Sequence, residues 1–595
     1  MGPLRFTHPP TGRQRTPLSC LRGEIPHLNL CPPINRITSS SPSLRLVIIG
    51  GVAAGASAAA RARRLDESAR ITLIERGPDV SFANCGLPYF IGGEIADRNA
   101  LAVQTPATLK QLLNIEVLTS TAAIGINRKA KEVQIQNVSD GATRTVAYDK
   151  LVLAPGAQPL RPPLPGIDDS RLFTLRNLGD MDRIKTATDE AAHVTVIGAG
   201  FIGLEMAEQF RHAGKEVTLV ELQPHVLPLL DQSMTHLMED ELKRHDIELV
   251  LGDGIASFSD VDGRLGCTLA SGRVITTDFA VLALGVRPDS ALARAAGLGL
   301  GPRGHIIVDT FMRTSDPDIY AGGDAIQVED FVSGDPSAVP LGGPANRQGR
   351  LIADHICRPD QAKPFPGALG TAIVRVFAVA AGLTGWTEKR LQAAGRGYRA
   401  VTVNDNHHAG YFPGAKPLML KMLSDPETGR ILGAQVTGLA GVDKRLDVLA
   451  TAITGGLTID DIAQLELAYA PPFGAAKDIV NLAGFTAVNA RDGLVYPVDR
   501  ISDDLALQVL DVRPPPLVAA HPLPYAGAIN IPFGMLRQRL GELDINRPVL
   551  TVCALGKTSY FAARILAQKG FQVTALTGGI RAHFDPLSPA KLPTP

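Results

Sequence analysis

Cys85 is the residue of this sequence with the clearest capacity for chemistry. It stands in the stretch Ser81–Tyr89, which reads Ser-Phe-Ala-Asn-Cys-Gly-Leu-Pro-Tyr, and no second cysteine is nearby. A cysteine reacts as its thiolate, which needs a lowered pKa and access to a substrate. The alternative is a small buried apolar residue, the usual fate of a free cysteine. The flanking Asn84 and Gly86 indicate a shaped loop, so we expect redox chemistry at this sulfur.

A second cysteine, Cys553, follows the apolar segment Val549–Val552 and precedes an expected helix. Its loop reads Cys-Ala-Leu-Gly-Lys-Thr and ends at Thr558. A cysteine at such a strand-to-helix turn can use loop N–H groups and the helix dipole to hold a thiolate or persulfide. The Gly-Lys-Thr also resembles the end of a P-loop. That pattern needs glycine at position 551, which is Thr551, so we reject nucleotide binding there.

A glycine-rich turn at residues 198–203 predicts a dinucleotide site. It reads Gly-Ala-Gly-Phe-Ile-Gly, follows an apolar strand and opens a helix. Gly198 allows the tight turn, Gly200 lets the backbone approach a pyrophosphate, and Gly203 packs helix on strand. Glu221 ends the next strand, where a carboxylate binds both ribose hydroxyls and repels a 2′-phosphate, which favours NADH over NADPH. The alternative is a tight turn that binds nothing.

A second glycine-rich turn, from Gly50 to Gly55, is less regular. Val52 stands where the middle glycine is expected, although small residues around it still permit close approach. Glu75 occupies the position of the ribose carboxylate. We expect a second dinucleotide site here, and the alternative is an ordinary loop between strand and helix.

Two further turns support that second site. Gly156 follows the strand 151–153, and Asp324 follows the apolar strand and glycines of segment 320–323. A carboxylate at the position of Asp324 could hold the ribityl chain and the pyrophosphate end of FAD. FAD and NADH are therefore the expected cofactors.

Length and composition bound the class of protein. The chain has 595 residues, enough for roughly four domains. It is 45% hydrophobic and 20% charged, with formal net charge +0, so neither nucleic acid nor a membrane surface is an expected partner. No apolar run approaches the roughly 20 residues of a membrane helix. The 6 cysteines are scattered, which favours free thiols in a reducing compartment and a cytoplasmic location.

The pattern along the chain predicts an α/β protein with two Rossmann-like domains, an α+β domain and a small C-terminal α/β domain. Two strand–turn–helix–strand units begin near Gly50 and Gly198, and alternating strands with a hairpin near Asp425 follow. The expected domains are an FAD-binding domain at 44–163 and 291–360, an NAD-binding domain at 164–290, a dimerisation domain at 365–490 and a last domain at 500–592. Residues 1–43 carry five arginines and one acid, Glu24, which is typical of a disordered or targeting extension; an upstream start codon chosen in error is a further alternative.

Residues 44–490 resemble the pyridine nucleotide–disulfide oxidoreductase family, in its single-cysteine branch of coenzyme A-disulfide reductases, NADH oxidases and persulfide reductases. The motifs that carry the resemblance are Ser81–Cys85, Tyr320–Asp324 and Ala468–Pro472. The resemblance implies that Cys85 faces the flavin and takes up substrate sulfur as a mixed disulfide. It also implies a homodimer and a small-molecule sulfur substrate.

The same resemblance implies roles for further residues. Those at the family's coenzyme A contacts are Ser57, Arg64, Ser81, Asn84 and Lys477. Tyr411 and Tyr469 match tyrosines that the second subunit places near the cysteine, although interface packing is the commoner fate of such residues. Asn346 stands where some members have histidine, and Leu113 stands near a position that can be lysine. Both departures weaken the case for coenzyme A disulfide as the substrate.

The tail resembles a rhodanese domain. Leu510–Arg513 and Gly527–Pro532 match its early and central motifs, and Cys553 matches its sulfur-carrying cysteine. Active rhodanese loops usually carry an arginine where Thr558 stands, and Lys557 is the residue that can supply this charge. The alternative is an inactive rhodanese fold used as a docking surface.

The main expectation is an FAD-dependent NAD(P)H oxidoreductase that reduces persulfide, polysulfide or coenzyme A disulfide through Cys85, with the tail handling sulfane sulfur. One alternative is an NADH oxidase or peroxidase that cycles through a cysteine sulfenic acid. Peroxidases of the family place a histidine in the first glycine-rich helix, and residues 53–64 contain none. Another alternative is a redox-responsive binding protein. No metal site is expected, since His407 and His408 have no cysteine or acid at ligand spacing.

Overall fold

The structure is a computed structural model and describes residues 43–501, 507–523, 525 and 527–583. The expected N-terminal extension lies outside the described residues except for Ser43, and so do Cys20, Cys31 and the last residues, 584–592, of the expected C-terminal domain.

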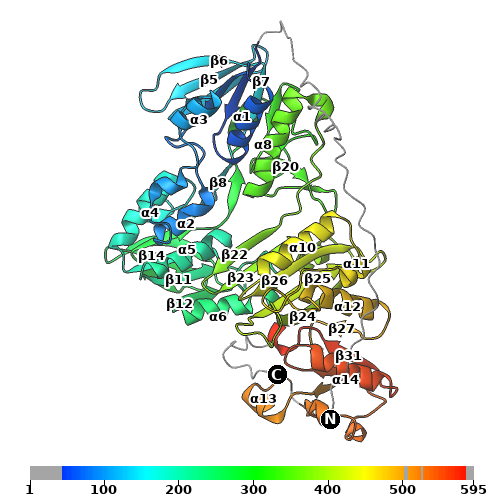
Figure 1. The fold of residues 1–595 in the computed structure, drawn as a ribbon. Coiled ribbons are helices and arrows are strands. Elements are labelled where there is room, and N and C mark those ends of the chain that lie inside the picture. Colours follow the sequence, from blue (N-terminus) through cyan, green and yellow to red (C-terminus); the bar gives the residue numbers. More distant parts are fainter. Residues whose placement is uncertain (1–42, 502–506, 524, 526, 584–595) are drawn as a thin grey trace, which may run out of the picture. The chain divides into compact units, whose positions relative to one another are not determined.

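The first sheet is parallel and five-stranded (Figure 1). In sheet order its strands are β19 (Ile319–Ala321), β7 (Lys150–Leu153), β1 (Arg45–Ile49), β2 (Arg70–Ile74) and β3 (Glu116–Leu118). Their nearly continuous apolar runs are buried, as expected for a parallel sheet covered on both faces. β1 lies in the middle, so the turn after it opens at the carboxyl edge of the sheet, where α/β proteins bind ligands.

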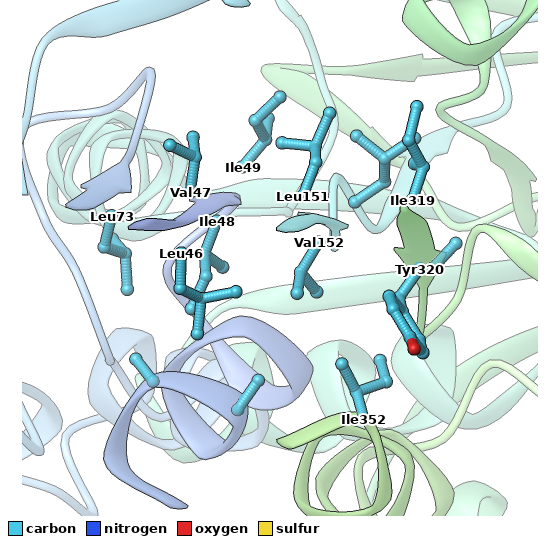
Figure 2. Packing of buried hydrophobic residues seen from close by; sticks show 14 of the residues in the cluster. Leu46, Val47, Ile48, Ile49, Leu73, Leu151, Val152, Ile319, Tyr320 and Ile352 are labelled. Carbon is cyan, nitrogen blue, oxygen red and sulfur yellow. The ribbon is translucent and has the colours of Figure 1, made fainter. Parts of the chain in front are cut away.

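The core of this sheet is built in rows across the strands. Ile48 pairs with Val152, which pairs with Tyr320, and Figure 2 shows these side chains on the same side as Ile352. Ile352 belongs to α8 (Gly342–Cys357), which packs on α1 (Ala53–Leu65). The two helices approach closely, because a Cβ at Gly349 would lie 2.1 Å from the carbonyl oxygen of Ala54.

Smaller elements complete this part of the chain. An antiparallel sheet of β4 (Thr121–Asn127), β5 (Glu132–Asn137) and β6 (Thr143–Ala147) contributes Val133 and Ile135 to the same core. The remaining elements are α2 (Leu87–Ile91), α3 (Pro106–Leu113), α7 (Ala291–Ala295), the pair β8 (Ala157–Pro159) and β17 (Val286–Pro288), and the sheet β18 (Ile306–Ile307), β20 (Ile326–Glu329) and β21 (Pro336–Ser337).

The second sheet repeats the design of the first. In sheet order its parallel strands are β12 (Ile247–Leu251), β11 (Glu216–Glu221), β10 (His193–Ile197), β16 (Phe279–Leu282) and β9 (Leu172–Phe173). The accompanying elements are α4 (Leu178–Glu190), α5 (Phe201–His212), α6 (His236–Arg244) and the antiparallel sheet β13 (Ile255–Val261), β14 (Arg264–Leu269) and β15 (Val274–Thr277). Again the glycine-rich turn follows the central strand, β10, and leads into a helix, α5.

The third sheet is antiparallel. In sheet order its strands are β22 (Ala372–Val376), β23 (Val379–Gly385), β26 (Ile431–Gly438), β25 (Pro417–Ser424) and β24 (Arg399–Asn406), and its helices are α9 (Glu388–Ala393), α10 (Val442–Thr454), α11 (Ile459–Gln464) and α12 (Ile479–Arg491). The hairpin expected near Asp425 joins β25 to β26. β24 is an edge strand, so part of its backbone has no partner within the sheet.

The fourth sheet is parallel. In sheet order its strands are β27 (Pro497–Val498), β31 (Val573–Leu576), β30 (Val549–Val552), β28 (Gln508–Asp511) and β29 (Ile529–Asn530), with helices α13 (Pro515–Ala520) and α14 (Lys557–Ala567). The expected strand-to-helix turn at Cys553 therefore joins β30 to α14. Two parallel sheets with glycine-rich turns, an antiparallel sheet and a small α/β sheet form the α/β architecture that the sequence predicts, which is confirmed.

Candidate active site

The two glycine-rich turns have the same geometry. Gly50 and Gly198 adopt φ angles of 97° and 103°, which side-chain-bearing residues rarely adopt. A Cβ on Gly50 would lie 2.0 Å from the carbonyl oxygen of Ala154, and one on Gly198 would lie 2.5 Å from that of Ala283. Gly55 and Gly203 pack each following helix against its turn, since a Cβ on either would lie 1.8 Å from a backbone oxygen. Both turns therefore require the glycines that the sequence pattern singled out.

Each turn is held by a carboxylate from the following strand. Glu75 Oε2 accepts a hydrogen bond from Gly51 N at 2.8 Å, and Oε1 accepts one from Gly77 N at 2.9 Å. Glu221 repeats this pattern with Ala199 N at 2.7 Å and Gln223 N at 2.9 Å. The backbone therefore fixes both carboxylates at the edge of their turns, where a ribose would meet them.

One large cleft joins the two turns. It has a volume of about 2460 Å³. Its walls include residues of the first and second sheets and of the first strands of the third sheet. The expected site residues that line it are Gly50, Ser57, Arg64, Glu75, Ser81, Asn84, Cys85, Gly156, Gly198, Gly200, Glu221 and Asp324. The space above Gly156 and Gly200 is open, since a Cβ on either would meet nothing within 4 Å. The residues present therefore fit two dinucleotides.

Asp324 lies in the cleft directly after β19 and its two glycines. Burial raises the pKa of its carboxyl group, and the charge of Arg176 opposes this rise. Asp324 and Cys85 line the same cleft, and the negative charge of Asp324 raises the pKa of the Cys85 thiol. The expected contact of Asp324 with the ribityl chain and the pyrophosphate end of FAD stays a prediction.

Cys85 lies in a short 3₁₀ turn, Asn84–Gly86, at the start of α2. Of the four cysteines that the structure describes, it alone lines the cleft, and it is exposed to it. Burial by the cleft walls raises the pKa of its thiol, and the negative charges of Glu205 and Asp324 raise it further. Both neighbouring charges thus disfavour the thiolate, and a hydrogen bond with the backbone of Cys85 is the effect that lowers the pKa of the thiol.

Glu205 and Tyr89 are two site residues that the sequence patterns did not identify. Glu205 lines the cleft with Cys85, and Tyr89 Oη donates a hydrogen bond to Glu205 Oε1 at 3.3 Å. Burial raises the pKa of Glu205 to about 7. Two features of the sequence could have identified them: Tyr89 follows Cys85 by four residues, and Glu205 is an acid in α5 two residues after Gly203.

Four of the expected coenzyme A contacts line the cleft, namely Ser57, Arg64, Ser81 and Asn84. Ser57 Oγ donates a hydrogen bond to Asn346 Oδ1 at 2.6 Å, so the departure at Asn346 lies next to one of these contacts. Asn84 Nδ2 donates to the carbonyl oxygen of Arg176 at 3.4 Å. Lys477 is exposed, does not line the cleft and lies in the loop between α11 and α12.

Tyr411 and Tyr469 lie outside the cleft of their own chain. Their hydroxyl oxygens are 3.1 Å apart, and the two side chains are 75% and 48% exposed. The hydrogen bond between them raises the pKa of Tyr411. The structure thus brings the two tyrosines together, but it does not bring them to Cys85 of the same chain.

Cys553 is buried at the turn between β30 and α14. Gly556 N donates a hydrogen bond to its Sγ at 3.1 Å, and Sγ donates to Ser559 Oγ at 3.4 Å. Cys553 does not line the large cleft. The two cysteines with expected chemistry therefore occupy separate sites.

One group of potential metal ligands occurs within the described ranges. Oxygen or nitrogen atoms of Glu94, Glu208 and His212 lie within 4.8 Å of one another. Arg375 already binds this group, with its Nη2 atom 2.5 Å from Glu94 Oε1 and 3.3 Å from Glu208 Oε1. Since a guanidinium neutralises these carboxylates, the group is an ion-pair cluster. His407 and His408 belong to no such group in the part of the chain that the structure describes.

Comparisons with known proteins agree with this geometry. The profile of the family described as pyridine nucleotide-disulphide oxidoreductase matches residues 44–345, its dimerisation domain matches 371–478, and the rhodanese-like domain matches 497–583. The coenzyme A disulfide reductase of Staphylococcus haemolyticus is 36% identical over 445 residues, which cover 74% of this chain and 99% of that protein.

Two solved structures resemble the chain over nearly its full length. The reduced Bacillus anthracis protein described as CoADR-RHD has a TM-score of 0.88 and 45% identity, and the match covers 91% of this chain and 98% of that one. The NAD-dependent persulfide reductase from A. fulgidus has a TM-score of 0.86 and 38% identity, with 91% and 100% covered.

These findings also bear on cofactors and on membranes. The family uses FAD and a nicotinamide dinucleotide, which agrees with two dinucleotide turns on one cleft. Among the described residues, none of the helices combines the length and the apolarity that crossing a bilayer requires. The chain belongs to the pyridine nucleotide–disulphide oxidoreductase family and carries that family's dimerisation domain followed by a rhodanese-like domain.

Proposed function

We propose that this protein is an FAD-dependent NADH oxidoreductase that reduces the sulfur–sulfur bond of a small molecule through Cys85. The substrate class comprises coenzyme A disulfide, coenzyme A persulfide and polysulfide. The observation that carries the proposal is that Cys85 is the one described cysteine on the cleft shared by the two dinucleotide turns. A second sulfur must then come from the substrate. Likeness to a coenzyme A disulfide reductase and to a persulfide reductase supports this class.

The sulfur step needs one nucleophile. The Cys85 thiolate attacks R–S–S–R′, forming a bond between Sγ and the first sulfur while R′–S⁻ leaves and takes up a proton. For a persulfide, R–S–SH, the leaving group is HS⁻. When bound, FAD and NADH supply the two electrons that the mixed disulfide needs. Reduction then returns the Cys85 thiolate and releases R–SH, so atoms and electrons balance.

Several contacts support recognition of a coenzyme A moiety. Ser57 and Asn346 are hydrogen-bonded on one wall, and Arg64 offers a positive charge on the same cleft. An arginine suits phosphate groups of a nucleotide because its guanidinium presents several donors. We assign Ser81 and Asn84 to the part of the substrate nearest the thiol, because both flank Cys85 on the cleft. Lys477 is assigned to a coenzyme A contact by its family position alone.

NADH is the proposed electron donor. Glu221 presents a carboxylate that is fixed by two backbone N–H groups at the ribose end of the second turn. Its neighbours on the cleft, Leu222 and Gln223, carry no positive charge for a 2′-phosphate. NADPH is therefore the poorer donor.

The active form is proposed to be a homodimer in the cytoplasm. Tyr411, Tyr469 and Phe473 are large, exposed side chains of the dimerisation region, which a second copy of the chain would cover. We assign the two tyrosines to the partner's Cys85, where a phenol can protonate a leaving thiolate. The four described cysteines are free, which supports a reducing compartment.

The rhodanese-like domain is proposed to carry sulfane sulfur on Cys553. The thiolate would attack the outer sulfur of a persulfide donor R–S–SH, forming Cys553–S–SH and releasing R–S⁻. The hydrogen bond from Gly556 N to Sγ supports an active cysteine over a docking role.

The proposal is tested by NADH consumption of the purified flavoprotein with coenzyme A disulfide, coenzyme A persulfide, polysulfide and oxygen as separate acceptors. We expect sulfur acceptors to exceed oxygen and Cys85→Ser to lose sulfur-dependent turnover. Cys553→Ser is expected to impair turnover of persulfides while sparing coenzyme A disulfide. Full sulfur-dependent activity in Cys85→Ser contradicts the proposal. Turnover with oxygen alone identifies an NADH oxidase instead.

A further inference from the structure

The sulfur of Cys553 receives its backbone hydrogen bond from a single peptide unit. Gly556 N donates to Sγ at 3.1 Å, and Gly556 is also the residue that precedes α14. Of the two hydrogen bonds described for this sulfur, this is the one in which the sulfur accepts. Its direction therefore affects how well the site holds an anionic thiolate or persulfide.

Three successive carbonyl groups of the loop are held by donors on its other side. Ile580 N donates to the carbonyl oxygen of Cys553 at 3.0 Å, and Arg581 N donates to that of Ala554 at 3.2 Å. The third acceptor is the carbonyl oxygen of Leu555, and its donor is Asn404 Nδ2 at 3.2 Å. The first two donors belong to the rhodanese-like domain. Asn404 belongs to β24 of the dimerisation sheet.

The hydrogen bond from Asn404 to Leu555 O also fixes the direction of the Gly556 N–H, because both groups belong to one rigid peptide plane. The C=O of Leu555 and the N–H of Gly556 are the two ends of the same planar, trans peptide unit. They point in opposite directions, so a donor that fixes the oxygen on one side also fixes the N–H on the other. Asn404 thus holds one end of the plane while the sulfur of Cys553 accepts from the other.

The same amide also holds the neighbouring turn. Asn404 Nδ2 donates to the carbonyl oxygen of Gly578 at 2.9 Å. The Gly578-Gly579 turn packs directly beneath the cysteine loop, since a Cβ on Gly579 would lie 2.6 Å from the carbonyl oxygen of Cys553. Asn404 therefore joins the two loops that flank the sulfur.

Asn404 is itself held in place at the domain contact. Thr577 Oγ1 accepts a hydrogen bond from Thr402 N at 2.8 Å and donates one to Thr402 O at 3.0 Å. These bonds satisfy backbone groups on the free edge of β24, two residues before Asn404. The edge strand and the rhodanese-like domain are thus joined independently of the Asn404 amide.

We propose that Asn404 is a positioning residue for the sulfur-carrying site: by holding the Leu555–Gly556 peptide, it directs the Gly556 N–H at Cys553 Sγ and so makes this cysteine more reactive. The inference rests on the proposed sulfur-carrying function of Cys553. It adds that this site is completed by a residue of the dimerisation domain.

The test compares variants of the full-length protein by the rate at which iodoacetamide alkylates Cys553, followed on the Cys553 peptide by mass spectrometry across a range of pH. Asn404→Ala removes the donor, and Asn404→Leu removes it while keeping nearly the same side-chain size and adding no charge. The matched control is Thr577→Val, which removes the neighbouring interdomain hydrogen bonds and leaves the Leu555–Gly556 peptide untouched. Circular dichroism and flavin absorbance check that each variant is folded.

We expect both Asn404 variants to react about tenfold more slowly at pH 7 and their pH–rate profiles to move to higher pH, because loss of a hydrogen bond to an anion has an effect of this order. Thr577→Val should react as the wild type does. Wild-type rates and profiles in both Asn404 variants would overturn the proposal, and so would an equal loss in Thr577→Val, which would indicate domain docking alone. Alkylation needs neither NADH nor Cys85, so a wrong assignment of the reductase activity leaves this result unaffected.

Discussion

Tyr89 and Glu205 join two distant parts of the chain by a hydrogen bond, and Glu205 is close enough to act electrostatically on Cys85. The Tyr89 hydroxyl donates to Glu205 Oε1 at 3.3 Å, and the two residues are 116 positions apart in the sequence. Tyr89 lies in α2, which begins just after Cys85, whereas Glu205 lies in α5, which begins at the second glycine turn. The carboxyl group of Glu205, which belongs to the helix after the second glycine-rich turn, therefore affects the thiol of Cys85 through its charge.

This relationship predicts how the reactivity of Cys85 depends on pH. The negative charge of Glu205 raises the pKa of the Cys85 thiol, and the pKa of Glu205 itself is about 7. In Glu205→Gln that charge is absent, so we expect a lower pKa for Cys85 and alkylation several-fold faster at pH 8. Below about pH 6 the wild-type carboxyl group is protonated, and the two proteins should react alike. An equal difference in rate at pH 5.5 and pH 8 would show that charge is not the cause.

The same carboxyl group predicts a pH dependence of stability. Burial raises the pKa of Glu205 from 4.5 to about 7, so the folded protein binds this proton more tightly than the unfolded chain. Its stabilising contribution is present below about pH 4.5 and is lost as pH rises to about 7. We expect the free energy of unfolding of Glu205→Gln, relative to that of the wild type, to rise by about 1–2 kcal/mol from pH 5 to pH 8, after allowance for partial solvation. Thermal unfolding of both flavin-loaded proteins at the two pH values measures this gain, and its absence contradicts the assignment.

Much of the fold and of the cleft could be predicted from local sequence patterns. The apolar runs ending at Gly50 and Gly198 are the central strands β1 and β10, and Glu75 and Glu221 hold the turns that follow them. These features depend on residues close in sequence, with periodicity and spacing that one strand–turn–helix unit fixes.

Contacts between distant segments could not be predicted in the same way. Asn404 meets Leu555 across 151 positions, and nothing in the alternation of β24 distinguishes that asparagine from a solvated edge residue. The contact between Tyr89 and Glu205 could not be predicted either, because it depends on how α2 packs against α5. Tertiary packing decides such pairs, and each sequence pattern describes one element at a time.

Coenzyme preference provides a test of Glu221. Replacement by glutamine keeps an oxygen for one of the two backbone N–H groups and removes the charge that repels a 2′-phosphate. We expect the ratio of kcat/KM for NADPH to that for NADH to rise about tenfold in Glu221→Gln, because both ribose hydroxyls lose a charged acceptor. Glu216→Gln, at the exposed start of the same strand, is the matched control and should leave the ratio unchanged. An unchanged ratio in Glu221→Gln would show that another group selects the coenzyme.

The exposed tyrosine pair predicts activity shared between subunits. Tyr411 and Tyr469 are hydrogen-bonded to each other at 3.1 Å and lie outside the cleft of their own chain. If they serve the partner's Cys85, a chain with Tyr411→Phe and Tyr469→Phe should form an inactive homodimer, as should a Cys85→Ser chain. A hybrid of the two contains one site with Cys85 from the first chain and both tyrosines from the second, so we expect about half of wild-type activity per dimer. Differently tagged chains, purified as the hybrid and assayed with NADH and a coenzyme A disulfide, measure it. A hybrid as inactive as both parents would place the tyrosines at the cysteine of their own chain, because neither chain could then complement the other. An active homodimer of the chain with both tyrosines replaced would place them outside catalysis.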